Sequence, residues 1–123
     1  TEMPPGWSYR PASGGHSVGL FFNFADAEET VFFGMCQKGE PTFGIGGGNY
    51  PLGATQFTLT VDGRSWDLPA FQGNHGRMLF VDDREPAEAI ARAKRVVAFR
   101  VREWERQLRP DRPLHQFASD CSG

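Results

Sequence analysis

The sequence predicts a single mainly β domain over residues 1–123: an antiparallel β-sandwich or barrel of about seven to nine short strands with one short helix. Three observations favour this fold class. Phenylalanine dominates the aromatic residues, with 11 Phe against 2 Tyr and 3 Trp, and 15 glycines separate short apolar runs. Several of these runs alternate apolar and polar residues, which is the period of a half-buried strand. A chain of 123 residues also has the size of one domain and can bury an adequate core without metal.

The N-terminal part of the chain is expected to supply four strands. Residues 1–15 form an irregular lead-in in which alternating aromatic residues predict a short edge strand. Residues 17–24 and 30–36 predict a hairpin joined by an acidic turn, and residues 42–46 predict a further short strand. The glycine-rich stretch up to Asn49 is followed by a proline-containing segment that cannot open a helix. We therefore interpret it as an inter-strand loop and not as a phosphate-binding loop.

The strongest local signal is Asp62-Gly63, which lies between two apolar runs, residues 57–61 and 64–68. An Asp-Gly pair favours a two-residue type I′ turn. Three cross-strand pairs then follow from the loop length: Val61 with Arg64, Leu59 with Trp66, and Phe57 with Leu68. A register slip of one residue would separate these apolar partners, so the pattern predicts a hairpin of fixed register.

The C-terminal part mixes a helix with strands. Residues 78–81 predict a short strand, and the acidic run ending in Pro86 predicts the start of a helix of about ten residues, with the proline at the first helical position. Residues 96–101 alternate as a strand. A charged loop is expected over residues 106–113, and residues 114–121 are expected to form a final turn or strand.

Charge is unevenly distributed along the chain. The formal net charge is −2, but residues 1–83 carry four basic and nine acidic residues, whereas residues 84–123 carry nine basic and six acidic ones. Because the whole chain is acidic, we expect no nucleic-acid partner, and no apolar run is long enough to predict a transmembrane segment. The expected partner is an unidentified protein or an anionic ligand, and no feature specifies an oligomeric state.

The two cysteines allow three interpretations. Cys36 lies in an apolar run and Cys121 lies near the C-terminus, and the pair could form a disulfide, remain as buried free thiols, or supply a nucleophile or metal ligand. We favour the disulfide between Cys36 and Cys121, which would indicate an oxidising compartment, periplasmic or extracellular. We expect an exported protein, and because the chain opens without a basic and apolar leader, its signal peptide would already have been removed.

No catalytic residue, metal site or cofactor is predicted. The three histidines, His16, His75 and His115, are scattered and do not have metal-ligand spacing. The adjacent carboxylate pairs fit a turn, at Glu28 and Glu29, and a helix start, at Asp82 and Asp83.

The best candidate for a binding site lies in the arginine-rich segment from Arg92 to Arg112. If the strand continues, Arg100 and Arg102 point to the same side, and Trp104 continues that side. Two guanidinium groups beside an indole could hold a carboxylate or phosphate and also stack on a ligand. The alternative is a solvated sheet face that Glu103 and Glu105 partly neutralise.

Several features occur together in the order of a known group. They are the lead-in with Trp7, Cys36 in an early strand, the hairpin with Leu59-Thr-Val-Asp-Gly63, the late helix, and the closing Phe117-Ala-Ser-Asp-Cys121. This layout resembles the small exported β-rich proteins of proteobacteria, including the invasion-associated locus B type. The resemblance implies a periplasmic β-sandwich with a binding or envelope-associated role, and it assigns no functional residues.

We therefore expect a non-enzymatic, exported binding module. One alternative is an inhibitor of an envelope hydrolase, in which the loop Gly73-Asn-His-Gly76 enters the cleft of the enzyme. The alternative from a different class is a small enzyme that uses Cys36 or a histidine.

Overall fold

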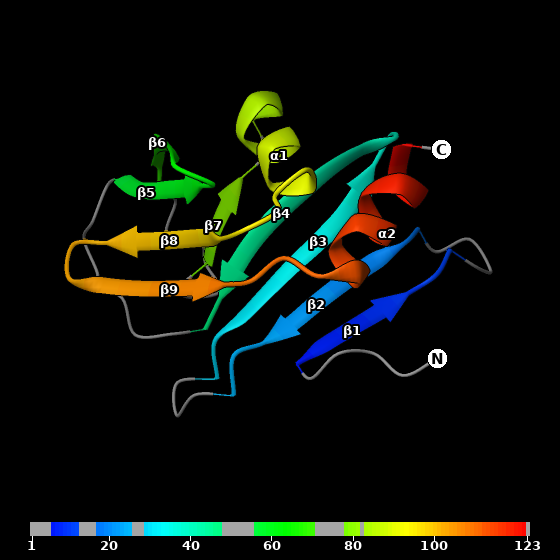
Figure 1. Ribbon diagram of the computed structural model, residues 1–123, viewed down its shortest axis with the longest axis horizontal. Helices are drawn as coiled ribbons and strands as arrows, with labels where there is room; N and C mark the ends of the chain where they lie inside the picture. Colours follow the sequence, from blue (N-terminus) through cyan, green and yellow to red (C-terminus); the bar gives the residue numbers. More distant parts are fainter. Residues whose placement is uncertain are drawn as a thin grey trace.

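The computed structural model describes residues 6–12, 17–25, 29–47, 56–70, 78–81 and 83–122 (Figure 1). Within these residues the chain forms the following elements in order: β1 (Trp7–Arg10), β2 (Gly19–Asn23), β3 (Val31–Gln37), β4 (Glu40–Gly46), β5 (Gln56–Val61), β6 (Arg64–Pro69), β7 (Met78–Val81), α1 (Arg84–Ala91), β8 (Val97–Val101), β9 (Trp104–Leu108) and α2 (Arg112–Ser122). The predicted mainly β class is confirmed.

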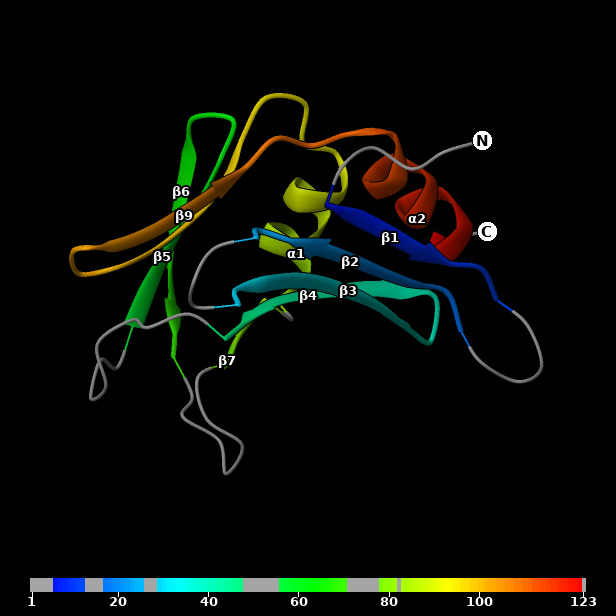
Figure 2. The same ribbon diagram turned by 90° about the horizontal axis from the view of Figure 1, so that it is seen from below.

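The strands form two antiparallel sheets. One sheet has the order β1-β2-β3-β4-β7 and the other has the order β6-β5-β8-β9, and the described strands do not close into a barrel. Figure 2 shows both helices on one side of the five-stranded sheet, with the four-stranded sheet crossing at one end of the same side. The architecture is therefore a β-sandwich whose inner side is completed by α1 and α2.

Phenylalanine rings join the two sheets in the core. Phe32 of β3 and Phe99 of β8 have ring centroids 6.0 Å apart, which links the inner faces of the sheets. Phe32 also stacks on Phe43 at 5.7 Å, and Phe57 stacks on Phe99 at 6.1 Å. All four are almost completely buried. Because each aromatic side chain buries a large apolar area, the unusual Phe content of the sequence is explained by this inter-sheet cluster.

The β5–β6 hairpin has the predicted register. Val61 pairs with Arg64, Leu59 with Trp66 and Phe57 with Leu68. Asp62 and Gly63 have φ angles of 49° and 92°, as a two-residue type I′ turn requires. The Asp62 carboxylate has a second structural role, because it accepts hydrogen bonds from the backbone N–H groups of Lys94, Arg95 and Val96 at 2.8, 2.8 and 2.9 Å. The turn thereby fixes the connection from α1 to β8.

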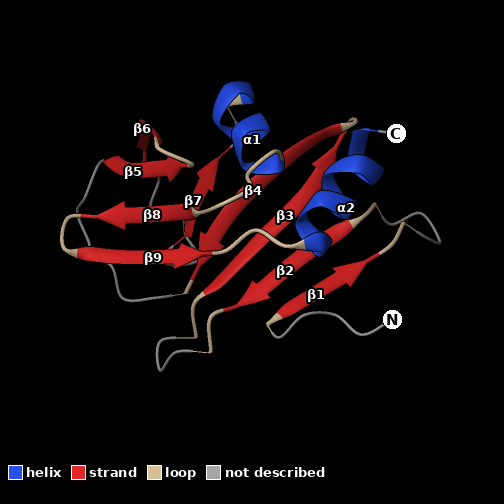
Figure 3. Ribbon diagram, viewed as in Figure 1, coloured by secondary structure: helices blue, strands red, loops and turns tan. Residues whose placement is uncertain are grey.

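The segment after β8 differs from the sequence prediction. A two-residue turn at Arg102 and Glu103 reverses the chain, and residues 104–108 then form β9 where a charged loop was expected from residue 106. Residues 112–122 form α2, drawn as a blue helix in Figure 3, where a final turn or strand was expected. The apolar residues Leu114, Phe117 and Cys121 recur at helical spacing and are all buried against the sheet. The structure thus has a second helix, which packs on β1, β2 and β4.

Two local features position the helices. Pro86 is the third residue of α1 and not the first, which a helix tolerates because the first four N–H groups have no intrahelical acceptor. Gly34 of β3 lies beneath α2, where a Cβ atom would come within 3.1 Å of the Phe117 and Phe43 rings. The missing side chain at Gly34 therefore lets Phe117 pack closely on the sheet.

Candidate functional site

The structure does not bring the three residues of the predicted arginine site together on one face, although Arg100 Nε donates a hydrogen bond to the Arg102 carbonyl oxygen at 3.1 Å. Arg100 is exposed on the outer face of β8, Arg102 lies in the turn with a φ of 54°, and Trp104 begins β9. Trp104 pairs with Val101, a buried inner-face residue, so its half-buried ring lies on the opposite face from Arg100. The prediction assumed a strand that continued through residue 104, whereas the turn reverses the chain. The Trp104 ring instead packs against the guanidinium of Arg106 at 4.9 Å.

The predicted disulfide between Cys36 and Cys121 is present. It joins β3 to the last turn of α2, with the two Cα atoms 5.5 Å apart. Both cysteines of the chain are used, so neither sulfur is a free thiol. The interpretations of these residues as free thiols, or as a nucleophile or metal ligand, are therefore wrong for this oxidised form.

The other predicted groups form no catalytic arrangement in the part of the chain that the structure describes. His16, His75, Glu28, Asp82 and the loop 73–76 lie outside the described residues. His115 Nε2 lies 2.7 Å from the carbonyl oxygen of Ala93 and so joins α2 to the segment after α1. Across the described ranges, no group of three or more His, Cys, Asp or Glu side chains is arranged to hold a metal ion.

An open cleft of about 940 Å³ lies between the tip of the β3–β4 hairpin, α1 and α2. Figure 1 shows this tip beside the C-terminal end of α2. The cleft residues are Gln37 to Thr42 of the hairpin, Arg84, Ala87, Glu88, Ala91 and Arg92 of α1 and its C-cap, and Ala118 and Ser119 of α2. The disulfide borders the cleft, because Cys36 precedes Gln37 and Cys121 lies two residues after Ser119.

The cleft carries both charged and small apolar side chains. Arg84 Nε and Glu88 Oε1 form an ion pair at 3.2 Å, and both side chains are substantially exposed. Lys38 and Arg92 make no side-chain hydrogen bond or ion pair with another described residue. Sequence reasoning missed this site because it comes from three separate segments. One signal was available: Arg84, Glu88 and Arg92 recur every four residues on one helix face.

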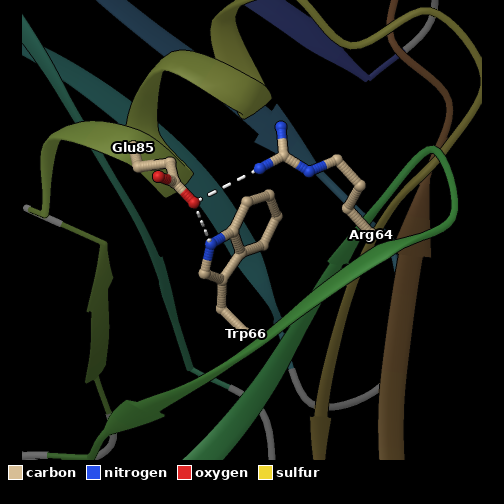
Figure 4. A network of polar contacts seen from close by, with 3 residues as sticks. All are labelled: Arg64, Trp66 and Glu85. Carbon is tan, nitrogen blue, oxygen red and sulfur yellow. Dashed lines mark hydrogen bonds and ion pairs between the residues drawn. The ribbon is translucent and has the colours of Figure 1, made fainter.

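A second polar cluster joins α1 to β6 (Figure 4). Oε1 of Glu85 accepts a hydrogen bond from Trp66 Nε1 at 3.1 Å and another from Arg64 Nη2 at 3.2 Å. The Arg64 guanidinium also lies 4.8 Å from the centre of the Trp66 ring. A smaller cleft of about 240 Å³ adjoins the cluster. Because the three side chains bind one another, this cluster is best explained as a link between the first turn of α1 and the four-stranded sheet.

The outer face of the five-stranded sheet is partly apolar. Phe21 is 43% exposed and Met35 is 37% exposed. Phe21 pairs with Phe33, whose ring makes an edge contact with Phe80 at 5.9 Å. Exposed apolar residues in a row can mark a contact surface. Nothing in the structure shows what would cover this row.

Comparison with known proteins gives no family assignment: no family model matches the chain, and no curated protein or solved structure matches it significantly. The resemblance to exported proteobacterial proteins therefore stays a prediction. Neither described helix has the length and apolar character needed to cross a membrane.

Proposed function

We propose that the protein is a non-enzymatic, exported binding module that holds its ligand in the cleft between the β3–β4 hairpin, α1 and α2. One observation carries this proposal: two walls of a cleft of about 940 Å³ are joined directly by the Cys36–Cys121 disulfide. Ligand sites are concave and typically enclose several hundred cubic ångströms. Walls that are covalently joined lose less conformational entropy when a ligand binds, which favours recognition.

The disulfide also supports the export of the protein. Structural disulfides persist in the periplasm and outside the cell, and they are rare in reducing compartments. The bridge joins elements that are 85 positions apart, so it closes most of the chain into one loop. The resemblance to small exported proteins of proteobacteria agrees with a periplasmic or secreted location.

The two alternative functions receive less support. A thiol enzyme would need Cys36 in its free form, and the sulfur of Cys36 is bonded to that of Cys121. His115 bonds to a backbone carbonyl and does not line the cleft. A hydrolase inhibitor acting through the loop 73–76 would rest on residues outside those described. The cleft, by contrast, consists of described residues from three elements.

The test compares two tryptophan substitutions. Ala91→Trp fills the cleft from α1, whereas Ser65→Trp adds the same ring at an exposed position on β6. Near-ultraviolet circular dichroism establishes that both variants are folded. Each is then titrated, with amide NMR detection, against a fixed set of hexapeptides, dicarboxylates and inorganic phosphate.

We expect at least one of these probes to shift the amide signals of residues 37–42 and 84–92 in the wild type and in Ser65→Trp. The same probe should bind Ala91→Trp at least about tenfold more weakly, a loss of about 1.4 kcal/mol. The proposal fails if none of the probes binds, or if every probe that binds does so equally well to Ala91→Trp.

A further inference from the structure

The wall that α1 contributes to the cleft has an ordered charge pattern. Arg84, Glu88 and Arg92 follow one another at intervals of four residues, so they lie along one face in the order positive, negative, positive. With a rise of about 1.5 Å per residue, the two arginines are about 12 Å apart along the helix axis. A ligand that complements this wall carries negative charge at two separated points and none between them.

The β3–β4 hairpin adds charged residues to this pattern, and most of the basic side chains in the cleft are available to a ligand. Lys38 lines the cleft from the turn between β3 and β4, and Glu40 lies close by on β4. The described lining thus has three cations and two carboxylates, a surplus of one positive charge. Glu88 pairs with Arg84, but their side chains are 46% and 80% exposed, so water weakens this pair and a ligand can compete for Arg84. Lys38 and Arg92 have no side-chain partner among the described residues.

Small side chains lie between the charged groups. Pro41, Ala87, Ala91 and Ala118 all line the cleft, and Ala87 is buried. No long apolar side chain from the described lining fills the space, so the main chain of a ligand can approach α1 closely. In an extended peptide the residues i and i+4 point to the same side and are about 13 Å apart. This separation matches the distance between Arg84 and Arg92.

We infer that the cleft binds an extended peptide segment with two acidic residues four positions apart and an uncharged residue midway between them. This inference rests on the proposed function, because it names the ligand of the same cleft. The acidic side chains bind near Arg84 and Arg92, the uncharged residue faces Glu88, and Lys38 supplies positive charge from the opposite wall. A single inorganic phosphate is too small to reach both arginines. The acidic residues of a helical peptide with the same spacing lie only about 6 Å apart.

The experiment uses three synthetic peptides with blocked ends. The first is Glu-Ala-Ser-Ala-Glu, the second is its isomer Ala-Glu-Glu-Ala-Ser with adjacent acids, and the third is Lys-Ala-Ser-Ala-Lys. Fluorescence anisotropy with the intact, oxidised protein should show the first peptide binding at least about threefold more tightly than its isomer, with no binding of the third. Raising the ionic strength should weaken binding of the first peptide, because exposed charges are screened.

Variants then assign the binding to the cleft. Lys38→Asn tolerates the positive φ of this position, and Lys38→Asn and Arg92→Ala should each weaken binding of the first peptide about two- to fivefold. Glu88→Gln should strengthen it, because it removes the central negative charge and releases Arg84. Arg100→Ala, which removes an exposed arginine far from the lining, is the matched control and should leave the affinity unchanged.

Each negative result has a defined meaning. The inference fails if the two acidic isomers bind equally, if Glu88→Gln weakens binding, or if Arg100→Ala costs as much as Arg92→Ala. If only neutral peptides or small dicarboxylates bind, and Ala91→Trp abolishes their binding, then the acidic-peptide inference is wrong and the proposed function stands. If Ala91→Trp leaves all binding unchanged, the proposed function itself is wrong.

Discussion

Asp120 near the end of α2 accepts a hydrogen bond from the hydroxyl group of Tyr9 in β1, a residue 111 positions earlier in the chain. Burial of the hydroxyl, its bond to Asp120 and the negative charge of that carboxylate together raise the pKa of Tyr9 from 10.0 to about 12. The contact lies close to the Cys36–Cys121 bridge, and both join α2 to the five-stranded sheet. The disulfide and this hydrogen bond therefore both hold α2 on the five-stranded sheet, in addition to its apolar face.

The Tyr9 contact predicts a loss of stability at high pH. Since the pKa is raised in the folded state, the contribution of Tyr9 is complete below about pH 10 and is lost as the pH rises towards about 12. Tyr9→Phe should lower the free energy of unfolding by about 1 kcal/mol at neutral pH. Between about pH 9 and pH 11 the wild type should lose more stability than the variant in urea unfolding. Parallel pH profiles for the two proteins would contradict this assignment.

The hydrogen bonds that the Asp62 carboxylate accepts predict a loss of folding stability at low pH. Burial of the carboxyl raises its pKa, but three backbone hydrogen bonds and the charge of Arg95 outweigh this and hold the pKa below the usual 3.8. The stabilising contribution is therefore present above about pH 4 and is lost as the pH falls through the lower folded-state pKa. Asp62→Asn should cost about 1–3 kcal/mol at neutral pH, because the amide presents an NH₂ group where a second acceptor oxygen is needed.

The matched control for Asp62 is Asp67→Asn. Asp67 is exposed on the same hairpin and accepts a hydrogen bond from the Thr58 hydroxyl at 3.0 Å. Asp67→Asn should lower the free energy of unfolding by well under 1 kcal/mol, because the amide oxygen of the asparagine can still accept this hydrogen bond. Urea unfolding of the three proteins between about pH 3 and pH 7 would reveal the difference. If the stability gap between the wild type and Asp62→Asn did not shrink on acidification, the role assigned to the carboxylate would be wrong.

The disulfide between Cys36 and Cys121 predicts a large effect on the stability of the protein. In the wild type, iodoacetamide should modify neither Cys36 nor Cys121 until a reductant is added. The double variant Cys36→Ala, Cys121→Ala should lose about 2–5 kcal/mol of stability, since a bridge across 85 positions strongly restricts the unfolded chain. Reductant should destabilise the wild type by a similar amount and leave the double variant unchanged. A wild type that is insensitive to reductant would show that the bridge contributes little.

The link between Glu85 and Trp66 can be measured by a double-mutant cycle. The single variants Glu85→Ala and Trp66→Phe remove the same hydrogen bond from its two ends, and their combination gives the coupling free energy. We expect about 0.5–1 kcal/mol, because the Glu85 side chain is 70% exposed. The control cycle pairs Trp66→Phe with Glu88→Ala, for which a coupling near zero is expected. Equal coupling in both cycles would exclude a specific link.

The β5–β6 hairpin and α2 show what the sequence could and could not predict. The register of the hairpin followed from Asp62-Gly63 alone, because a two-residue turn leaves one possible pairing. The helical spacing of Leu114, Phe117 and Cys121 was also available in the sequence, yet a final turn or strand was expected for this short segment. The helix is stabilised by the packing of these three residues against the sheet, a tertiary interaction that local sequence does not show.

The turn before β9 and the cleft were harder to predict, for two different reasons. Arg102 adopts a φ of 54° without being Gly, Asn or Asp, so no turn signature marks the reversal. Without that turn, Arg100 and Trp104 were expected on one face, and pairing across the turn places them on opposite faces. The cleft brings together residues 37–42, 84–92 and 118–119, and no spacing along the chain connects these three segments.

The bridge between Cys36 and Cys121 also determines how the protein behaves when it is cut. The bond converts the chain from position 36 to position 121 into a covalent ring. One proteolytic cut anywhere within this ring opens it but releases no fragment, because both new ends remain attached through the sulfur atoms. Such a nicked molecule would keep its mass in a non-reducing gel and would separate into pieces only after reduction. Where proteases are present, damage to one peptide bond within the ring would therefore leave β3 and α2 on the same molecule.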